Sequence, residues 1–130
     1  MTNNYFTDDE LRCKGSSFLM LAPGFRGKLN ELREAFGKPM VVNSCCRSYA
    51  HNAKVGGHPH SLHVCDDNGY HKTKGSCAID IDTSSMSEND REKLIFLATA
   101  NGWSVGLGGT FLHLDLRTAY TTLPQACFDY

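Results

Sequence analysis

Three residues able to bind a metal ion stand in or near two short tracts of the chain. His63 precedes the tract Ala78–Asp82, which holds Asp80, and the later tract Phe111–Arg117 holds His113. Imidazole nitrogens and carboxylate oxygens are common zinc ligands, and a zinc ion held by three side chains keeps a further position open for water. An open position separates a catalytic zinc site from a structural one, so these residues are candidates for a catalytic site.

Both tracts alternate apolar and polar residues, as strands do when one face covers a core. Alternate side chains of a strand point to opposite faces. Leu112, Leu114 and Leu116 therefore share one face of the later tract, and His113 and Asp115 share the other. The earlier tract alternates in the same way, with two isoleucines opposite its aspartates. Acidic groups between buried positions are costly unless they are paired, and a divalent metal is such a partner.

The composition is typical of one globular domain. The chain has 130 residues, of which 41% are hydrophobic and 21% charged, and we expect a single domain over residues 1–130. A formal net charge of -1 argues against a nucleic-acid partner, because phosphate binding depends on clustered Lys and Arg. No run of about 18 apolar residues is present, so membrane insertion is not expected. The first residues do not resemble a secretion signal, and we expect a monomer made in the cytoplasm.

Six cysteines are many for a chain of this length, and none forms a C-x-x-C motif. They are consistent with small buried residues, with disulfides formed in an oxidising space, or with metal ligands. Cys45 and Cys46 are adjacent and would point to opposite sides of a strand, which disfavours a bond between them. Cys65 and Cys77 flank a polar segment and are the best candidates for a disulfide, which would stabilise the fold by roughly 3 kcal/mol.

The remaining patterns indicate the elements that would position the candidate ligands. A capping box at Thr7–Glu10 predicts a short helix or turn. Apolar residues recur at helical spacing over Phe25–Phe36 and again after the capping pattern at Ser87, so we expect two amphipathic helices. We expect strands over Pro39–Asn43, Ala78–Thr83, Trp103–Gly108 and Thr110–Arg117, and a long loop over Ser44–His63. Helices and strands are partly segregated, which predicts an α+β domain with a small, mainly antiparallel sheet and flanking helices.

Several ordered motifs give the chain a resemblance to a known family. In chain order they are Ser44-Cys45-Cys46-Arg47-Ser48, His51-Asn52 with Gly56-Gly57, Ser61-Leu62-His63, Ala78-Ile79-Asp80-Ile81 and Phe111-Leu112-His113-Leu114-Asp115-Leu116-Arg117. Over residues 6–117 the chain resembles the zinc peptidases of the D-Ala-D-Ala carboxypeptidase and L-alanyl-D-glutamate endopeptidase family, which share a fold with the Hedgehog N-terminal domain. Small members of this family without a signal peptide are often phage endolysins.

The resemblance implies a role for each matching residue. His63, Asp80 and His113 match the ligands of one zinc ion. Arg47 matches an arginine beside the substrate, where its forked donors would hold a carboxylate or polarise a carbonyl. Ser61 matches a serine near the substrate cleft. The implied reaction is metal-assisted hydrolysis, in which a carboxylate moves a proton from the attacking water to the leaving amine.

The chain departs from the family pattern in two places. Several branches have the catalytic carboxylate three residues before the last zinc histidine, where this chain has Thr110. We expect Asp115 to act as the general base instead, with Asp82 as a weaker candidate. If Arg117 pairs with Asp115, that carboxylate is less free to act. The interval between the first histidine and the aspartate is also longer than usual, because of an insertion near Val64–Ser76.

The leading expectation is a zinc metallopeptidase that cuts the stem peptides of bacterial peptidoglycan, as a phage endolysin acting on the cell wall after release. Whether it cuts D-Ala-D-Ala or L-Ala-D-Glu stays open. One alternative is a non-catalytic zinc-binding interaction module, which Thr110 in place of the carboxylate favours. Another is a wall-degrading component of the phage tail, carried in the virion. For His51, His58, His60 and His71 we expect no metal-binding role.

Overall fold

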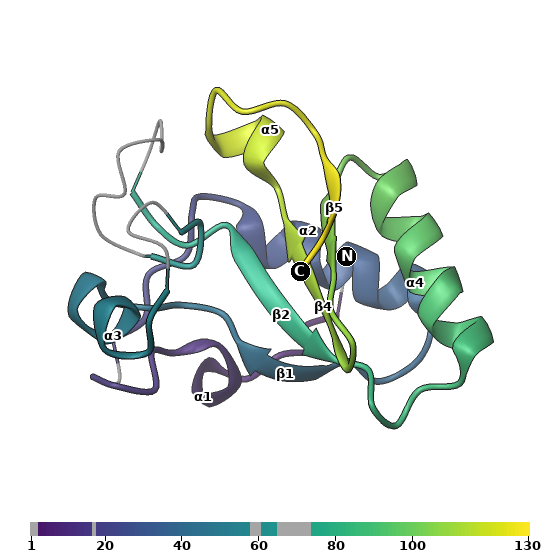
Figure 1. The fold of residues 1–130 in the computed structure, drawn as a ribbon, viewed down its shortest axis with the longest axis horizontal. Helices are drawn as coiled ribbons and strands as arrows, with labels where there is room; N and C mark the ends of the chain where they lie inside the picture. Colours follow the sequence, from purple (N-terminus) through teal and green to yellow (C-terminus); the bar gives the residue numbers. More distant parts are fainter. Residues whose placement is uncertain (1–2, 17, 58–60, 65–73) are drawn as a thin grey trace.

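The structure is a computed structural model that describes residues 3–16, 18–57, 61–64 and 74–130 (Figure 1). Within them the helices are α1 (Asp8–Leu11), α2 (Phe25–Phe36), α3 (Tyr49–Lys54), α4 (Glu88–Ala100) and α5 (Arg117–Tyr120), and the strands are β1 (Val41–Ser44), β2 (Ala78–Asp82), β3 (Ser104–Leu107), β4 (Phe111–Asp115) and β5 (Cys127–Asp129). None of the described helices is long and apolar enough to cross a membrane.

The strands form one sheet in the order β1-β2-β4-β3-β5. Strands β1, β2, β4 and β3 pair antiparallel to their neighbours, and β5 joins β3 in parallel. The predicted α+β class with a mainly antiparallel sheet is therefore confirmed. Strands β2 and β4, which carry Asp80 and His113, lie side by side near the middle of the sheet (Figure 1). A central position fixes both side chains more firmly than an edge strand would, because each strand is hydrogen-bonded on both sides.

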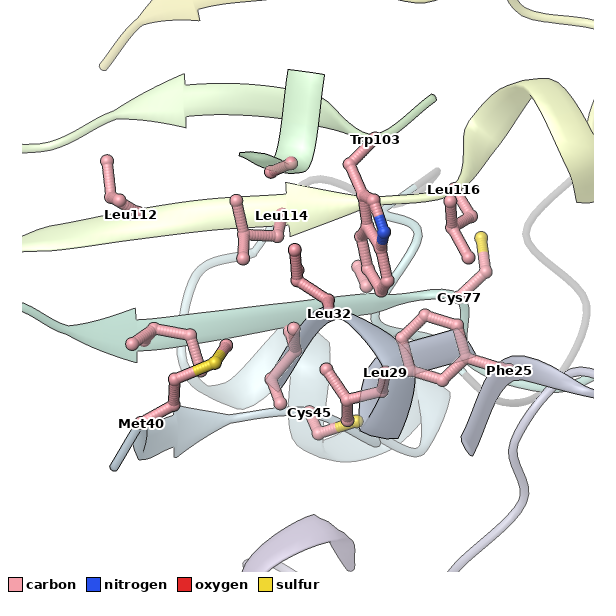
Figure 2. Close-up of a cluster of buried hydrophobic side chains, with 14 of the residues drawn as sticks. Phe25, Leu29, Leu32, Met40, Cys45, Cys77, Trp103, Leu112, Leu114 and Leu116 are labelled. Atoms are coloured by element: carbon pink, nitrogen blue, oxygen red, sulfur yellow. The ribbon is translucent and has the colours of Figure 1, made fainter. Parts of the chain in front are cut away.

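One face of the sheet covers the core, as the alternation in the two tracts predicts. Leu112 and Leu114 are fully buried with Ile79 and Ile81 of the neighbouring strand. Helix α2 packs its apolar stripe into the same cluster, and Figure 2 shows Leu29 and Leu32 beside the strands. Each fully buried aliphatic side chain contributes about 1.5–3 kcal/mol to stability. The opposite face of the two strands is left for Asp80 and His113.

Helix α2 begins and ends where the sequence predicts. Its buried residues are Phe25, Leu29, Asn30, Leu32 and Phe36, which recur every three or four positions. Gly37 ends the helix in the left-handed conformation with a φ of 76°, which glycine adopts without steric cost. Helix α4 begins as predicted after Ser87, whose Oγ accepts a hydrogen bond from the backbone N–H of Asp90 at 3.1 Å.

A cross-strand register places one residue of each strand in a single row. Ser44 pairs with Asp80, Asp80 pairs with His113, His113 pairs with Gly106, and Gly106 pairs with Phe128. Directly paired residues of neighbouring strands send their side chains to the same face. The row therefore runs across the whole sheet on the face away from the core, and it organises the site described below.

Part of the predicted loop over Ser44–His63 is helical, so that prediction is wrong for residues 49–54. Helix α3 begins after Ser48, whose Oγ accepts a hydrogen bond from the backbone N–H of His51 at 3.2 Å. Asn52 is the one buried residue of this helix, so no apolar periodicity marked it in the sequence. Helix α5 and strand β5 were also not predicted, because both are too short to carry a clear periodic pattern.

The cysteines do not pair as predicted. Cys77 is a buried thiol, and burial together with the nearby Asp115 carboxylate raises its pKa to about 12. The predicted Cys65–Cys77 disulfide is therefore wrong at Cys77, while Cys65 lies outside the described residues, as do His58, His60, His71 and most of the Val64–Ser76 insertion. Cys13 and Cys45 are likewise buried thiols, which fits the alternative that they serve as small core residues.

Candidate metal centre

The three predicted ligands meet at one point of the sheet. One ligand atom each from His63, Asp80 and His113 lies within 4.8 Å of the other two. Asp80 Oδ1 is 3.1 Å from His63 Nε2 and 3.0 Å from His113 Nδ1. The pairing of β2 with β4 brings Asp80 directly opposite His113, and His63 reaches the same carboxylate from the described segment 61–64.

The outer nitrogen of each imidazole faces an acceptor. His63 Nδ1 lies 2.8 Å from the carbonyl oxygen of Cys45, and His113 Nε2 lies 2.7 Å from Asp115 Oδ2. A neutral imidazole has only one N–H, and a hydrogen bond from the outer nitrogen leaves a lone pair on the inner one. Orienting contacts of this kind are typical of histidines that bind metals.

In such a neutral ring, the inner nitrogen of His63 faces the carboxylate of Asp80 with a lone pair and no hydrogen of its own. Burial lowers the pKa of His63, against the opposing effect of Asp80, so this ring is neutral at pH 7. Its Nε2 lone pair and the Asp80 oxygen are two acceptors facing each other, an arrangement that a cation between them makes favourable. Two imidazoles and a carboxylate are also a donor set that zinc prefers. The residues present therefore fit a zinc ion.

The electrostatics of the cluster favour an ionised aspartate. Burial alone would raise the pKa of Asp80, but its close contacts with the His113 and His63 rings outweigh it and hold the pKa well below the usual range. Burial would lower the pKa of His113, and its hydrogen bonds to Asp115 and Asp80 raise it instead. Asp80 is thus a charged ligand at any physiological pH, ready to pair with a cation.

The cluster opens into a cavity of about 670 Å³. Its described lining comes from the α3 region, β2, β4 and the segment after β4: Arg47, Gly56, Gly57, Ser61, Leu62, His63, Asp80, Phe111, His113, Arg117, Leu123, Phe128 and Tyr130. Asp80 is the one acidic side chain in this described lining. A volume of this size accommodates a short stretch of peptide.

Arg47 and Ser61 both lie in the cavity wall. Arg47 Nη2 is 3.6 Å from Asp80 Oδ2, its Nε donates to Ser44 Oγ at 3.1 Å, and its Nη1 donates to Asn52 Oδ1 at 3.2 Å. Ser61 Oγ accepts a hydrogen bond from the backbone N–H of His63 at 3.3 Å. Ser61 therefore helps to fix the backbone of a candidate ligand, and the guanidinium of Arg47 is held against the rim of the cluster.

Asn52 is a site residue that sequence reasoning missed. It is 1% exposed, and its side-chain oxygen faces Gly57 so closely that a Cβ at that position would lie 2.1 Å from Oδ1. The backbone N–H of Gly57 also donates to the carbonyl oxygen of Asn52 at 2.8 Å. Asn52 and Gly57 thus form a packed unit behind Arg47. The His51-Asn52 and Gly56-Gly57 motifs were the available signal, and the structure gives them a physical reason.

Asp115 lies behind His113, on the side away from the ligand cluster. It is fully buried, and Arg117 holds both of its oxygens, with Nε 2.9 Å from Oδ1 and Nη2 2.7 Å from Oδ2. The Arg117 backbone N–H adds a hydrogen bond of 3.0 Å to Oδ1. Asp82 is also apart from the cluster: it accepts from the backbone N–H of Ser84 at 2.8 Å and lines a separate cavity of about 230 Å³.

A family model described as Peptidase M15 matches residues 4–115, which is most of the chain. The chain belongs to the peptidase M15 family. The M15 peptidases are zinc-dependent, in agreement with the donor set of the cluster. No curated protein matches the chain. The match ends at Asp115, so four residues of the cavity wall in this M15 peptidase, which are Arg117, Leu123, Phe128 and Tyr130, lie beyond it.

Proposed function

We propose that this M15 peptidase is a zinc metallopeptidase that hydrolyses peptide bonds in the stem peptides of bacterial peptidoglycan, and that it serves as a phage endolysin. The observation that carries the proposal is the cluster of His63, Asp80 and His113, which is preorganised by hydrogen bonds and opens into a peptide-sized cavity. The family and the donor set support the reaction class. The resemblance to D-Ala-D-Ala and L-alanyl-D-glutamate peptidases supports the substrate.

His63 Nε2, Asp80 Oδ1 and His113 Nδ1 would hold the ion. A zinc ion bound there supplies Lewis-acid chemistry, which makes water acidic enough to attack at neutral pH and polarises the carbonyl to be cleaved. The Cys45 carbonyl and Asp115 fix the rotation of the two rings, and so aim both inner nitrogens at one point. Preorganisation of this kind removes a reorganisation cost that the reaction would otherwise carry.

Arg47 is placed to bind a negatively charged or polarised oxygen of the substrate. Its Nε and Nη1 are occupied by Ser44 and Asn52, which leaves the Nη2 edge toward Asp80 and the cavity. Stem peptides carry free carboxylates and carbonyl oxygens, and a guanidinium binds either through charge-assisted hydrogen bonds. We assign Arg47 to substrate binding and to stabilisation of the negative charge that develops on the carbonyl oxygen.

We propose a positioning role for Asp115 in place of the general base expected from the sequence. Both of its oxygens are engaged by Arg117 and one of them by His113, and it is absent from the described cavity lining. A base must reach the proton that it removes, within about 3 Å or through one water. A carboxylate behind the imidazole is suited to holding that imidazole.

Digestion of purified peptidoglycan by the zinc-loaded protein tests the function. We expect new muropeptides whose masses identify one cleaved peptide bond, and no new products in the presence of a chelator. The masses also separate cleavage at D-Ala-D-Ala from cleavage at L-Ala-D-Glu. Unchanged muropeptides with fully zinc-loaded protein would contradict the proposal.

A second candidate function is a non-catalytic zinc-binding module. The favouring observation is that Asp80 is the one acidic side chain in the described cavity lining, while Asp115 is held by Arg117. The digestion distinguishes the two functions when zinc content is measured on the same sample. Stoichiometric zinc with unchanged muropeptides would favour the module.

Removal of the Asn52 side chain is predicted to weaken catalysis without weakening metal binding. Asn52→Ala takes an acceptor from Arg47 Nη1, which lets the guanidinium leave the cavity rim. We expect kcat/KM for peptidoglycan fragments to fall roughly tenfold, the effect of one lost hydrogen bond to a charged group. Zinc content should match that of the unmodified protein. Asn89→Ala, which changes an exposed residue of α4, is the control. Full activity of Asn52→Ala would show that Asn52 is not needed to hold Arg47 at the cavity rim.

A further inference from the structure

The last strand, β5, brings aromatic rings beside His113 of the candidate metal site. Because β5 pairs in parallel with β3, Phe128 lies in register with Gly106, and Gly106 pairs with His113. The centroids of the Phe128 and Tyr130 rings each lie 5.9 Å from that of His113. Tyr130 also packs edge-to-face on Phe111 at 5.1 Å. We call Phe111, Phe128 and Tyr130 the aromatic wall of the cavity.

A glycine in β3 makes this approach possible. A Cβ on Gly106 would lie 2.6 Å from the Tyr130 ring and 2.7 Å from the Phe128 ring. Any other residue at this position would displace both rings from the sheet. Gly106 has no positive φ that would require glycine for backbone reasons. The close approach of the rings is therefore what the glycine provides.

The aromatic wall is anchored but still faces the cavity. The Arg117 guanidinium carbon lies 5.2 Å from the Phe128 ring centroid, and Asp115 holds that guanidinium by two hydrogen bonds. Phe128 is half-buried and Tyr130 is 68% exposed, although all three rings line the cavity. Aromatic rings at the mouth of a polar site offer apolar contact area at low entropic cost, because each has only two side-chain torsions to order.

We propose that the aromatic wall determines specificity by binding the uncharged, apolar side chain of the substrate residue next to the cleaved bond. The proposal rests on the proposed function and deepens it. Arg47 and Arg117 line the same cavity, so a lysine-type side chain there would meet like charges. An alanine-type side chain would cover the rings without burying a charge. Phe128 and Tyr130 lie beyond the residues that the family model matches, so the family match does not itself assign them a role.

Kinetics of wall variants test the proposal, with synthetic stem peptides that carry alanine or lysine next to the cleaved bond. We expect Phe128→Ala and Tyr130→Ala to raise KM for the alanine peptide roughly tenfold with a smaller change in kcat, and to reduce the preference for alanine over lysine. Tyr130→Phe, which keeps the ring, should recover most of the loss. Phe96→Ala is the control, since Phe96 is 72% exposed on α4, away from the cavity.

A second pair of variants moves the rings without removing them. Gly106→Ala is expected to raise KM as the ring deletions do, because its Cβ displaces both rings. Gly109→Ala is the matched control, because a Cβ there meets nothing within 4 Å. An unchanged alanine preference in Phe128→Ala, Tyr130→Ala and Gly106→Ala would overturn the proposal.

Binding of peptidoglycan by zinc-depleted protein tests the role of the aromatic wall separately from the proposed function. The chelator-treated protein cannot hydrolyse its substrate, so cosedimentation with purified peptidoglycan reports binding alone. We expect Phe128→Ala and Tyr130→Ala to bind roughly tenfold more weakly than the unmodified protein. If the two variants bind peptidoglycan as tightly as the unmodified protein, the proposed role of the aromatic wall is contradicted and the proposed function is not. Absence of binding by the unmodified protein would contradict both.

Discussion

Asp80→Asn is expected to abolish zinc binding and hydrolysis while leaving the fold intact. Asp80 Oδ1 lies 3.1 Å and 3.0 Å from the two inner imidazole nitrogens, so its charge is at the centre of the cluster. Asparagine has the same shape but offers a neutral oxygen and an NH₂ group that repels a cation. We expect hydrolysis to fall by at least about a thousandfold, or roughly 4 kcal/mol of transition-state stabilisation.

Asp82→Asn is the matched control for that experiment. Asp82 lies two residues further along the same strand and on the same face, but it accepts from Ser84 and lines the other cavity. An asparagine oxygen can still accept that hydrogen bond. We therefore expect Asp82→Asn to retain zinc and activity, which would also exclude the weaker candidate for the general base.

Thermal unfolding gives a readout of metal binding that does not depend on activity. A ligand that binds only the native state raises the melting temperature as its concentration exceeds the dissociation constant. Added zinc should raise Tm of the unmodified protein and of Asp82→Asn, and a chelator should reverse the shift. Asp80→Asn should show no shift. A zinc-dependent Tm in Asp80→Asn, or residual hydrolysis near the unmodified level, would rule out Asp80 as a required ligand.

The faces taken by two of the candidate ligands were predictable from the alternation of apolar and polar residues in their strands. Leucines at 112, 114 and 116 put His113 on the polar face of its strand, and Ile79 and Ile81 do the same for Asp80. A period of two decides which face a side chain takes. It does not decide which strands pair, and the register of Asp80 with His113 became visible only in the sheet.

The contacts of Asp115 were not predictable from spacing. His113 and Asp115 were correctly expected on one face of the strand, which brings their side chains within reach of each other. The predicted strand over Thr110–Arg117 is too long, because Arg117 begins helix α5 and reaches Asp115 from there. Which imidazole nitrogen faces Asp80 and which faces Asp115 depends on the rotation of the His113 ring. Two hydrogen bonds from opposite sides set that rotation, and one of them comes from another strand.

The aromatic wall escaped prediction for a different reason. Phe128 and Tyr130 alternate with polar residues, which is a weak strand signal over so few positions. Their place beside His113 depends on a parallel pairing with β3 that follows a connection through α5. Long-range pairing of a short strand leaves little local trace in a sequence. Gly106 was the one clue, since glycine inside a strand often marks a close approach.

Asp115→Asn is expected to weaken zinc binding more than it lowers the rate of the zinc-loaded enzyme. Asparagine can still accept from His113 Nε2, but it lacks the charge that strengthens this hydrogen bond and the ion pair with Arg117. Orienting partners of metal-binding histidines typically contribute about 10–100-fold in metal affinity. We expect a loss of that size in zinc titrations, and recovery of most of kcat at saturating zinc.

A general base would behave in the opposite way. If Asp115 removed the proton, Asp115→Asn would bind zinc normally and lose kcat at every zinc concentration, and the limb of the pH–rate profile that reports the base would disappear. Arg117→Lys sharpens the distinction, because it keeps the positive charge but loses the two-point contact with Asp115. If Asp115 positions His113, Arg117→Lys weakens the contacts that hold Asp115 in place. Zinc affinity should then fall, as it does in Asp115→Asn. If Asp115 were the general base, Arg117→Lys would leave zinc affinity unchanged.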